Sequence, residues 1–187
     1  FNAIGASLAL LASFDVFLFF SAYIFVLWFY SHKLKKITFI GNLTAALLSI
    51  TPFFAIFIYY NLEDLLILTY VSFILLIIFI REIIKDLEAL KGDVILGYPT
   101  LPATIGIKST KWTIAFFAIL GLIPAAAIFY KTQFTGVSYY LMAGGISVFL
   151  SLLLLIKAHS QKDFSQINQL YRLLIIGGIL SLVLFAG

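Results

Sequence analysis

The chain has 187 residues, of which 63% are hydrophobic and 11% are charged. Because a soluble domain carries charge on roughly a quarter of its residues, this composition excludes an ordinary soluble protein, and its high hydrophobicity excludes intrinsic disorder. The sequence contains no cysteine and two histidines, which excludes disulfide frameworks and thiolate or His-rich metal sites. A formal net charge of +4 is spread thinly through the apolar chain, so we expect a membrane protein with no nucleic-acid partner.

Long runs without charge recur along the sequence. A helix that spans a bilayer needs about 20 mostly apolar residues, and the runs lack the alternation of a membrane β-barrel. We therefore expect an all-α membrane protein, a transmembrane bundle with six complete spans and one partial span. The complete spans are predicted at 16–32, 37–62, 65–80, 112–130, 132–156 and 173–187, and the partial span at 1–14.

The sequence shows no internal repeat, so we expect residues 1–187 to form a single transmembrane domain. The first residue is Phe1 and the only methionine is Met142. We therefore expect that the sequence is truncated at its N-terminus.

The basic residues between the spans are distributed very unevenly. Alternate connections contain eleven Lys and Arg residues, whereas the remaining connections contain Lys131 alone. Basic residues near span ends collect on the cytoplasmic side. We therefore expect loops at 31–38, 81–111 and 157–172 in the cytoplasm of a multi-pass protein in a bacterial or archaeal cell membrane.

Half of the eight acidic residues fall in one stretch, REIIKDLEALKGD, from Arg81 to Asp93, here called the acidic segment. On a helix, Glu82, Asp86, Ala89 and Asp93 would lie at about 0°, 40°, −20° and 20°, which places three carboxylates on one narrow stripe. Carboxylates four residues apart repel each other, and a divalent cation between them would reverse this effect. Oxygen ligands without nearby Cys or His are typical of Mg²⁺.

The alternative interpretation of the acidic segment is a solvated helix whose charges pair locally, such as Glu82 with Lys85 and Glu88 with Lys91. Gly92 is a candidate end for this helix, which would remove Asp93 from the stripe. The two interpretations stay open at this point.

Two parts of the chain resemble the UbiA-type intramembrane prenyltransferases. The acidic segment, with the Gly97, Thr100-Leu101-Pro102 and Gly106 that follow it, is similar to the second aspartate-rich motif of that family and the loop after it. The upstream Tyr30-Ser31, Leu34-Lys35 and Gly41-Asn42 are similar to the family's loop two spans earlier. The resemblance covers residues 30 to 106 with specific motifs and continues as a hydropathy pattern to the end.

The resemblance implies nine transmembrane helices around a central cavity, with this chain beginning in the third helix. It implies Mg²⁺ as the cofactor, held by two aspartate-rich motifs on the diphosphate of an isoprenoid donor. The first motif is absent from this sequence, and Ala89 occupies a position that is usually Asp, so Glu82 or Glu88 would have to compensate. The implied metal ligands are Asp86, Asp93 and Glu82, the diphosphate-binding residues are Lys35, Lys91 and Arg81, and the cavity residues near the carbocation are Tyr30, Asn42 and Tyr70, with Tyr59 and Tyr60 as further aromatic candidates.

The expected function is transfer of a prenyl group from an allylic isoprenoid diphosphate to an acceptor, on the cytoplasmic side of the membrane. The pattern of the acidic segment resembles most the branches of the family whose acceptor is a glycerol phosphate lipid, and an aromatic acceptor of quinone biosynthesis is the alternative. Two alternatives belong to other classes of membrane protein. A secondary transporter is disfavoured because the acids lie at span ends and no repeat is found, and a catalytically inactive membrane scaffold is motivated by Ala89.

Overall fold

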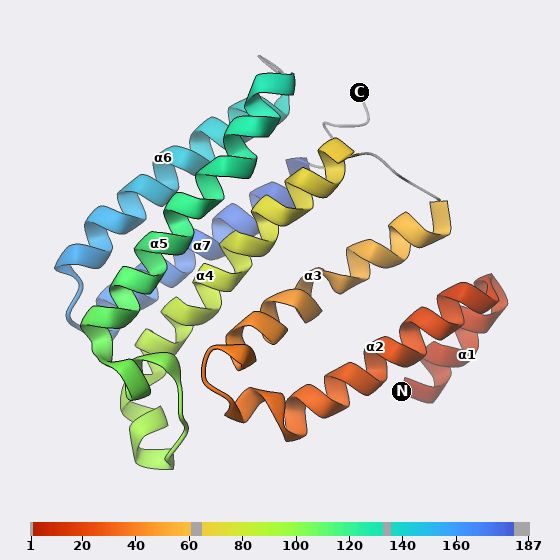
Figure 1. Ribbon diagram of the computed structural model, residues 1–187, viewed down its shortest axis with the longest axis horizontal. Coiled ribbons are helices and arrows are strands. Elements are labelled where there is room, and N and C mark those ends of the chain that lie inside the picture. Colours follow the sequence, from red (N-terminus) through yellow and green to blue (C-terminus); the bar gives the residue numbers. More distant parts are fainter. Residues whose placement is uncertain (1, 61–64, 133–135, 182–187) are drawn as a thin grey trace. The chain divides into compact units, whose positions relative to one another are not determined.

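The computed structural model describes residues 2–60, 65–132 and 136–181. In these residues the chain forms seven α-helices and one short 3₁₀-helix, with no strand (Figure 1). The expectation of an all-α bundle is therefore confirmed. The chain divides into two compact units, residues 1–64 and 65–187, and each is described by itself. The assignment of a single domain stays a prediction.

The first unit contains α1 (Asn2–Ala12), α2 (Phe14–His32), the 3₁₀-helix η1 (Leu34–Lys36) and α3 (Ile40–Tyr60). A serine between α1 and α2 explains why the chain restarts a helix there: the side chain of Ser13 accepts a hydrogen bond of 3.1 Å from the amide of Val16. This is the usual role of an N-cap residue. Helix α2 packs on both α1 and α3, and the hydroxyl of Tyr23 donates to the carbonyl of Leu48 at 3.2 Å.

The second unit contains α4 (Leu65–Leu96), α5 (Leu101–Thr132), α6 (Gly136–Lys157) and α7 (Gln161–Ser181). Helix α4 packs against α5 and α7, and α6 packs against the same two helices (Figure 1). Helix α4 is more enclosed than α5 or α6, since 61% of its most apolar stretch is buried, compared with 22% for α5 and 28% for α6. The fold thus places the helix that carries the acidic segment at the core of this unit.

The acidic segment is the continuation of α4 and not a loop. The helix runs through Gly92 without interruption and ends after Leu96, where Gly97 has a φ of +68°. The amide of Tyr98 donates to the Asp93 carbonyl at 2.9 Å, and the amide of Gly97 donates to Val94 at 3.3 Å. This is a Schellman termination, which needs a left-handed residue that glycine supplies at low cost. Asp93 therefore stays on the helix.

The connection after α6 is also shorter than the sequence suggested. Helix α7 begins at Gln161, inside the loop predicted at 157–172. Ser160 and Asp163 form a capping box: Asp163 accepts from the amides of His159 and Ser160 at 2.9 and 2.8 Å, while its own amide donates to the Ser160 hydroxyl at 3.2 Å. The two predicted cytoplasmic connections at 81–111 and 157–172 are thus largely helical, because charge density marks where a helix leaves the apolar phase and not where it ends. Their location on the cytoplasmic side stays a prediction.

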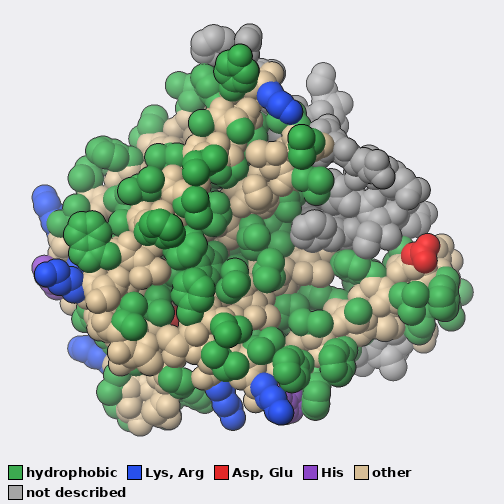
Figure 2. Space-filling view, in the orientation of Figure 1, with side chains coloured by type: hydrophobic (Ala, Val, Ile, Leu, Met, Phe, Trp, Pro, Cys, Tyr) green, Lys and Arg blue, Asp and Glu red, His purple; other side chains and the backbone are tan. Residues whose placement is uncertain are grey.

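Four helices in the described residues are long and apolar enough to cross a membrane, at Phe14–Lys36, Leu65–Leu96, Leu101–Lys131 and Ser138–Lys157, and Ile40–Pro52 is a shorter apolar helix. Large hydrophobic side chains are exposed along α5 and α6, for example Trp112 at 71% and Ile146 at 61%. Hydrophobic side chains cover much of the face seen in Figure 2, where Lys and Arg are few and separate. These features confirm a multi-pass membrane protein, while the count of six spans stays a prediction, in part because residues 61–64 and 182–187 lie outside the description.

Candidate functional site

The acidic segment lies at the C-terminal end of α4, beyond the part of the helix that a bilayer accommodates. Helix α4 has 32 residues and is therefore about 48 Å long at 1.5 Å per residue, against a hydrocarbon core of about 30 Å. Some 20 residues from Leu65 reach to Ile84. The carboxylates of Asp86 and Asp93 therefore lie past the apolar stretch, where a charged substrate can approach them.

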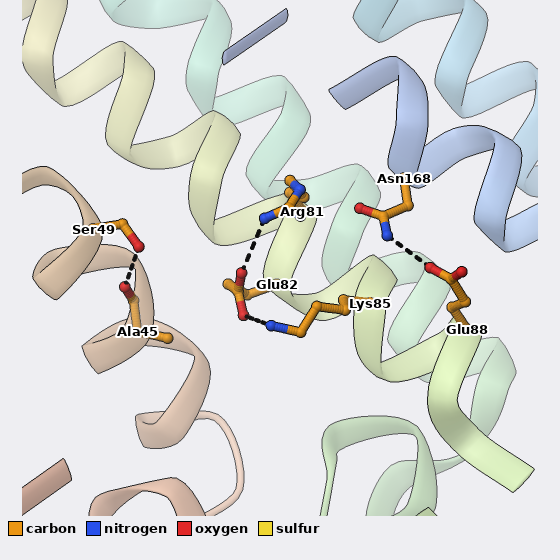
Figure 3. A network of polar contacts seen from close by, with 7 residues as sticks. All are labelled: Ala45, Ser49, Arg81, Glu82, Lys85, Glu88 and Asn168. Atoms are coloured by element: carbon orange, nitrogen blue, oxygen red, sulfur yellow. Dashed lines mark hydrogen bonds and ion pairs between the residues drawn. The ribbon is translucent and has the colours of Figure 1, made fainter. Parts of the chain in front are cut away.

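Glu82 is the buried member of the acidic stripe. The residue is 9% exposed, and its two oxygens accept from Lys85 Nζ at 2.6 Å and from Arg81 at 3.3 Å (Figure 3). Two cations thus compensate one carboxylate at the depth where α4 leaves the apolar phase. Local pairing, the alternative interpretation of the segment, is confirmed for Glu82 and Lys85. It leaves Glu82 as the weakest of the three predicted metal ligands.

Asp86 and Asp93 lie on the same face of α4, as the helical projection predicts, and both side chains are half-buried. Seven residues separate them, which is about 10 Å along the axis, so one ion would not contact both. Ala89 lies between them and is exposed. The face of α4 that carries these residues is thus accessible, and the methyl group of Ala89 occupies the place where the resemblance implies a third carboxylate.

Glu88 points away from this stripe, toward α7. Its Oε2 accepts a hydrogen bond of 2.7 Å from the side-chain amide of Asn168 (Figure 3). The predicted pair of Glu88 with Lys91 is not among the ion pairs found in the described residues. Sequence reasoning missed Asn168. The sequence feature that could have indicated it is the pair of adjacent polar residues Asn168 and Gln169 in the first half of an otherwise amphipathic helix.

The basic residues predicted to bind diphosphate differ in their surroundings. The Arg81 side chain is 22% exposed and pairs with Glu82, while its Nε is buried without a hydrogen-bond partner. Lys91 is exposed on α4, and Lys35 is exposed on η1. Since Lys35 belongs to the first unit and the acidic segment to the second, a joint site formed by Lys35, Arg81 and Lys91 stays a prediction.

The three residues predicted for the cavity are also divided between the units. Tyr30 is half-buried at the end of α2, and Asn42 is 9% exposed in the first turns of α3. Next to Asn42, a Cβ on Gly41 would lie 3.2 Å from the Leu34 carbonyl oxygen, so the close approach of η1 and α3 depends on this glycine. The side chains of Tyr59 and Tyr60 lie outside the described residues.

Tyr70 is completely buried near the start of α4. Its hydroxyl donates to the Gly178 carbonyl at 2.9 Å and also bonds with the Ser181 hydroxyl. Sixteen residues separate it from Asp86, which is about 24 Å along the helix. These contacts account for Tyr70 as a link between α4 and α7, and its role beside a carbocation stays a prediction.

The donor set is compatible with Mg²⁺, although it does not form a closed cage. Among the described residues, no three Asp, Glu, His or Cys side chains gather into a group that could hold a metal. Mg²⁺ commonly takes one or two protein carboxylates and completes its coordination shell with waters and substrate phosphates. Asp86 and Asp93 meet this requirement as accessible oxygen ligands without competing nitrogen or sulfur donors.

The fold and this segment together define a class: an α-helical membrane protein with an acidic, magnesium-compatible segment where a central helix leaves the apolar phase. The comparison with known families supplies the particular family. The model of the UbiA prenyltransferase family matches residues 1–181. The chain belongs to this family, so the resemblance seen in the motifs is confirmed.

Curated relatives carry a common name, digeranylgeranylglyceryl phosphate synthase. The protein of that name from Thermococcus gammatolerans is 31% identical over 169 residues, which cover 90% of this chain and 60% of the relative. The one from Pyrococcus horikoshii is 36% identical over 65% of this chain and 44% of the relative, and that from Sulfurisphaera tokodaii is 27% identical over 98% and 64%. The chain thus spans about half to two thirds of the length of these relatives. No solved structure matches it significantly.

Proposed function

We propose that the protein containing this chain is an intramembrane prenyltransferase that transfers a prenyl group from an allylic isoprenoid diphosphate to the hydroxyl of a glycerol phosphate lipid. The observation that carries the proposal is the accessible acidic face of α4, with Asp86 and Asp93 just beyond the apolar stretch. Family membership and the shared name of the relatives support the same reaction class and acceptor.

The proposed reaction breaks the allylic C–O bond of the donor and forms an ether C–O bond to the acceptor. Diphosphate leaves with the bonding electron pair, and the acceptor hydroxyl loses its proton. Developing negative charge on the leaving group is the main electrostatic demand of this step. Asp86 and Asp93 would each contribute a carboxylate to a separate Mg²⁺ ion, and these ions would neutralise diphosphate charge when bound. Lys35 and Lys91 would donate hydrogen bonds to diphosphate oxygens, and Arg81 would add positive charge beside Glu82.

The apolar helices supply the second requirement, a place for the isoprenoid chain that excludes water from the allylic cation. Large hydrophobic side chains are exposed on the described helices, including Phe116 of α5 and Ile146 of α6, at 62% and 61%. A donor whose diphosphate lies at the end of α4 and whose prenyl chain extends into the apolar phase satisfies both requirements. The expected location of this site is the cytoplasmic side, where eleven of the twelve basic residues lie in the proposed topology.

The proposal is tested with the full-length protein in detergent, incubated with radiolabelled geranylgeranyl diphosphate and either geranylgeranylglyceryl phosphate or 4-hydroxybenzoate. We expect a labelled lipid ether that requires Mg²⁺ and the glycerol phosphate acceptor. Label on the aromatic compound would replace the proposed acceptor with that of quinone biosynthesis. Absence of product with both acceptors, in a protein that remains folded by circular dichroism, would contradict the proposed function and favour an inactive scaffold.

A further inference from the structure

A buried hydrogen bond joins the acidic segment to the last described helix. Asn168 on α7 is 6% exposed, and its Nδ2 donates to Glu88 Oε2 at 2.7 Å across the interface between α4 and α7. Figure 3 shows the amide nitrogen turned toward Glu88 and the amide oxygen turned away from it. An ionised carboxylate only accepts hydrogen bonds, so this orientation of the amide is the one that the pair permits.

This orientation leaves the other half of the amide unsatisfied. Asn168 Oδ1 is buried and has no hydrogen-bond partner. Buried polar atoms are nearly always paired. Here the bond to Glu88 fixes the side chain of Asn168, and its own carbonyl oxygen is left without a partner.

The end of the acidic segment has few other anchors, in contrast to its start, where Ile83, Ile84 and Leu87 are buried. After Leu87, the residues of α4 from 89 to 96 are exposed or half-buried, so side-chain packing does little to fix the rotation of this part of the helix. Glu88 lies about 120° around the helix from Glu82 and therefore anchors the side that faces α7. Its bond to Asn168 directly follows the buried Leu87, at the start of the exposed end of the helix whose rotation decides where Asp93 points.

We propose that Asn168 is a positioning residue, which acts through Glu88 to fix the rotation of the end of the acidic segment and so directs Asp93 toward the metal and diphosphate. This inference rests on the proposed function for the identity of the ligands. It adds α7 to the elements that build the site. It also assigns Glu88 the role of orienting the helix. In this role Glu88 does not replace the carboxylate that is missing at Ala89.

Four single variants of the full-length protein, and the double variant that combines Asn168→Leu with Glu88→Leu, test the proposal. Asn168→Leu and Glu88→Leu each remove the bond, from opposite sides. Glu88→Gln keeps an acceptor for Asn168 Nδ2 and can offer a donor to its unpaired Oδ1, while it removes the charge. Tyr171→Phe is the matched control, because it removes a buried hydrogen bond of 3.0 Å between α7 and Ser151 of α6 one turn away without touching the acidic segment.

The measurement is the binding of Mn²⁺ in the presence of inorganic diphosphate, followed by electron paramagnetic resonance, together with the apparent melting temperature. We expect both leucine variants to weaken Mn²⁺ binding by about tenfold or more, as the loss of an orienting partner typically does. The double variant should bind no more weakly than either single variant. Glu88→Gln should retain wild-type binding and at least wild-type melting temperature, and Tyr171→Phe should lower only the melting temperature.

Two results would overturn the proposal. Unchanged Mn²⁺ binding in the leucine variants would reduce Asn168 to a packing residue, and a loss in Glu88→Gln equal to that in Glu88→Leu would make Glu88 a direct ligand. Because binding is measured without turnover, these results are separate from the test of the proposed function. A wild-type protein that binds Mn²⁺ and diphosphate but forms no prenyl lipid would contradict the reaction, while the comparison among variants would stand.

Discussion

The hydroxyl of Tyr70 donates a hydrogen bond of 2.9 Å to the carbonyl of Gly178, 108 positions later in the chain. The contact joins the start of α4 to the end of α7, at the opposite end of α4 from the acidic segment. It is possible because Gly178 lacks a side chain: a Cβ there would meet Ile74 Cδ1 and lie 2.7 Å from the hydroxyl oxygen of Tyr140. Close approach of helices at small residues is a common feature of membrane bundles.

Replacing Gly178 with Ala should therefore destabilise the bundle by about 1–3 kcal/mol, the usual cost of overpacking. This cost exceeds the gain of about 0.5–1 kcal/mol that Ala brings to a helix interior. The matched control is Gly145→Ala on α6, where a Cβ would meet nothing within 4 Å. Unfolding by SDS in mixed micelles measures both, and equal stabilities of the two variants would contradict the packing role of Gly178.

Asp86 and Glu82 should respond differently to loss of charge. Asp86→Asn should reduce Mg²⁺-dependent turnover about 100-fold or more, at the upper end of the effects expected for a group at the metal, with little change in stability. Glu82→Gln should instead destabilise the protein by about 1–2 kcal/mol, because it weakens the contacts to Lys85 and Arg81 while Lys85 remains half exposed. Initial rates at varied Mg²⁺ and the melting temperature separate the two effects. Equal losses of turnover would contradict the assignment of Glu82 to charge pairing.

Restoring a carboxylate at Ala89 should tighten the Mg²⁺ dependence. Two unit charges about 4 Å apart attract by about 1 kcal/mol in water, so a carboxylate beside the divalent Mg²⁺ is worth about 2 kcal/mol, and Ala89→Asp should lower the Mg²⁺ concentration for half-maximal rate about thirtyfold. Ala103→Asp, at another exposed alanine near the start of α5, adds the same charge away from the stripe and should change nothing. An unchanged Mg²⁺ requirement in Ala89→Asp would show that position 89 is not a ligand position in this protein.

Lys35 should bind the diphosphate of the donor, whereas its neighbour Lys36 provides the control with the same charge and exposure. Loss of one charge-assisted hydrogen bond costs about 1.5–3 kcal/mol, so Lys35→Gln should raise the KM for the donor about tenfold or more. Lys36→Gln should change it less than twofold. Steady-state rates at varied donor concentration measure both variants. Similar KM values for the two variants would remove Lys35 from the proposed site.

The capping box of α7 predicts a specific pH dependence of stability. The amides of His159 and Ser160, and the hydroxyl of Ser160, donate to Asp163 and lower the pKa of its carboxyl below the ordinary value. A lowered pKa means that the folded state binds the proton more weakly than the unfolded state. The stabilisation is therefore complete above the unfolded pKa of about 3.9, and it is lost as the pH falls through the lower folded value.

Melting temperatures of the wild type and Asp163→Asn, measured between pH 7 and pH 3, test this prediction. We expect the wild type to be more stable at pH 7 and the difference to shrink below about pH 4, the unfolded pKa of an aspartate. A difference that is constant over the whole range would contradict a role for the ionised carboxylate.

The periodicity of apolar runs was sufficient to predict an all-helical membrane protein, and the spacing of acids predicted that Asp86 and Asp93 share a face of one helix. Helix ends were less predictable. Both Gly92 and Gly97 are candidate terminators in the sequence, and Gly97 terminates α4 because the Asp93 and Val94 carbonyls receive their hydrogen bonds there. Local composition does not distinguish a glycine inside a helix from one with a left-handed backbone.

By itself, therefore, the sequence determined the class of protein, the one helix that carries half of its acidic residues, and the family to which it belongs, because hydropathy and spacing along a helix are local properties of the chain. Only the tertiary structure decided the long-range partners of the polar groups. It turned Glu88 toward Asn168 and buried Tyr70 against Gly178. The physical reason is that the partner of a buried polar group is chosen by helix packing, which brings together residues 80 to 108 positions apart.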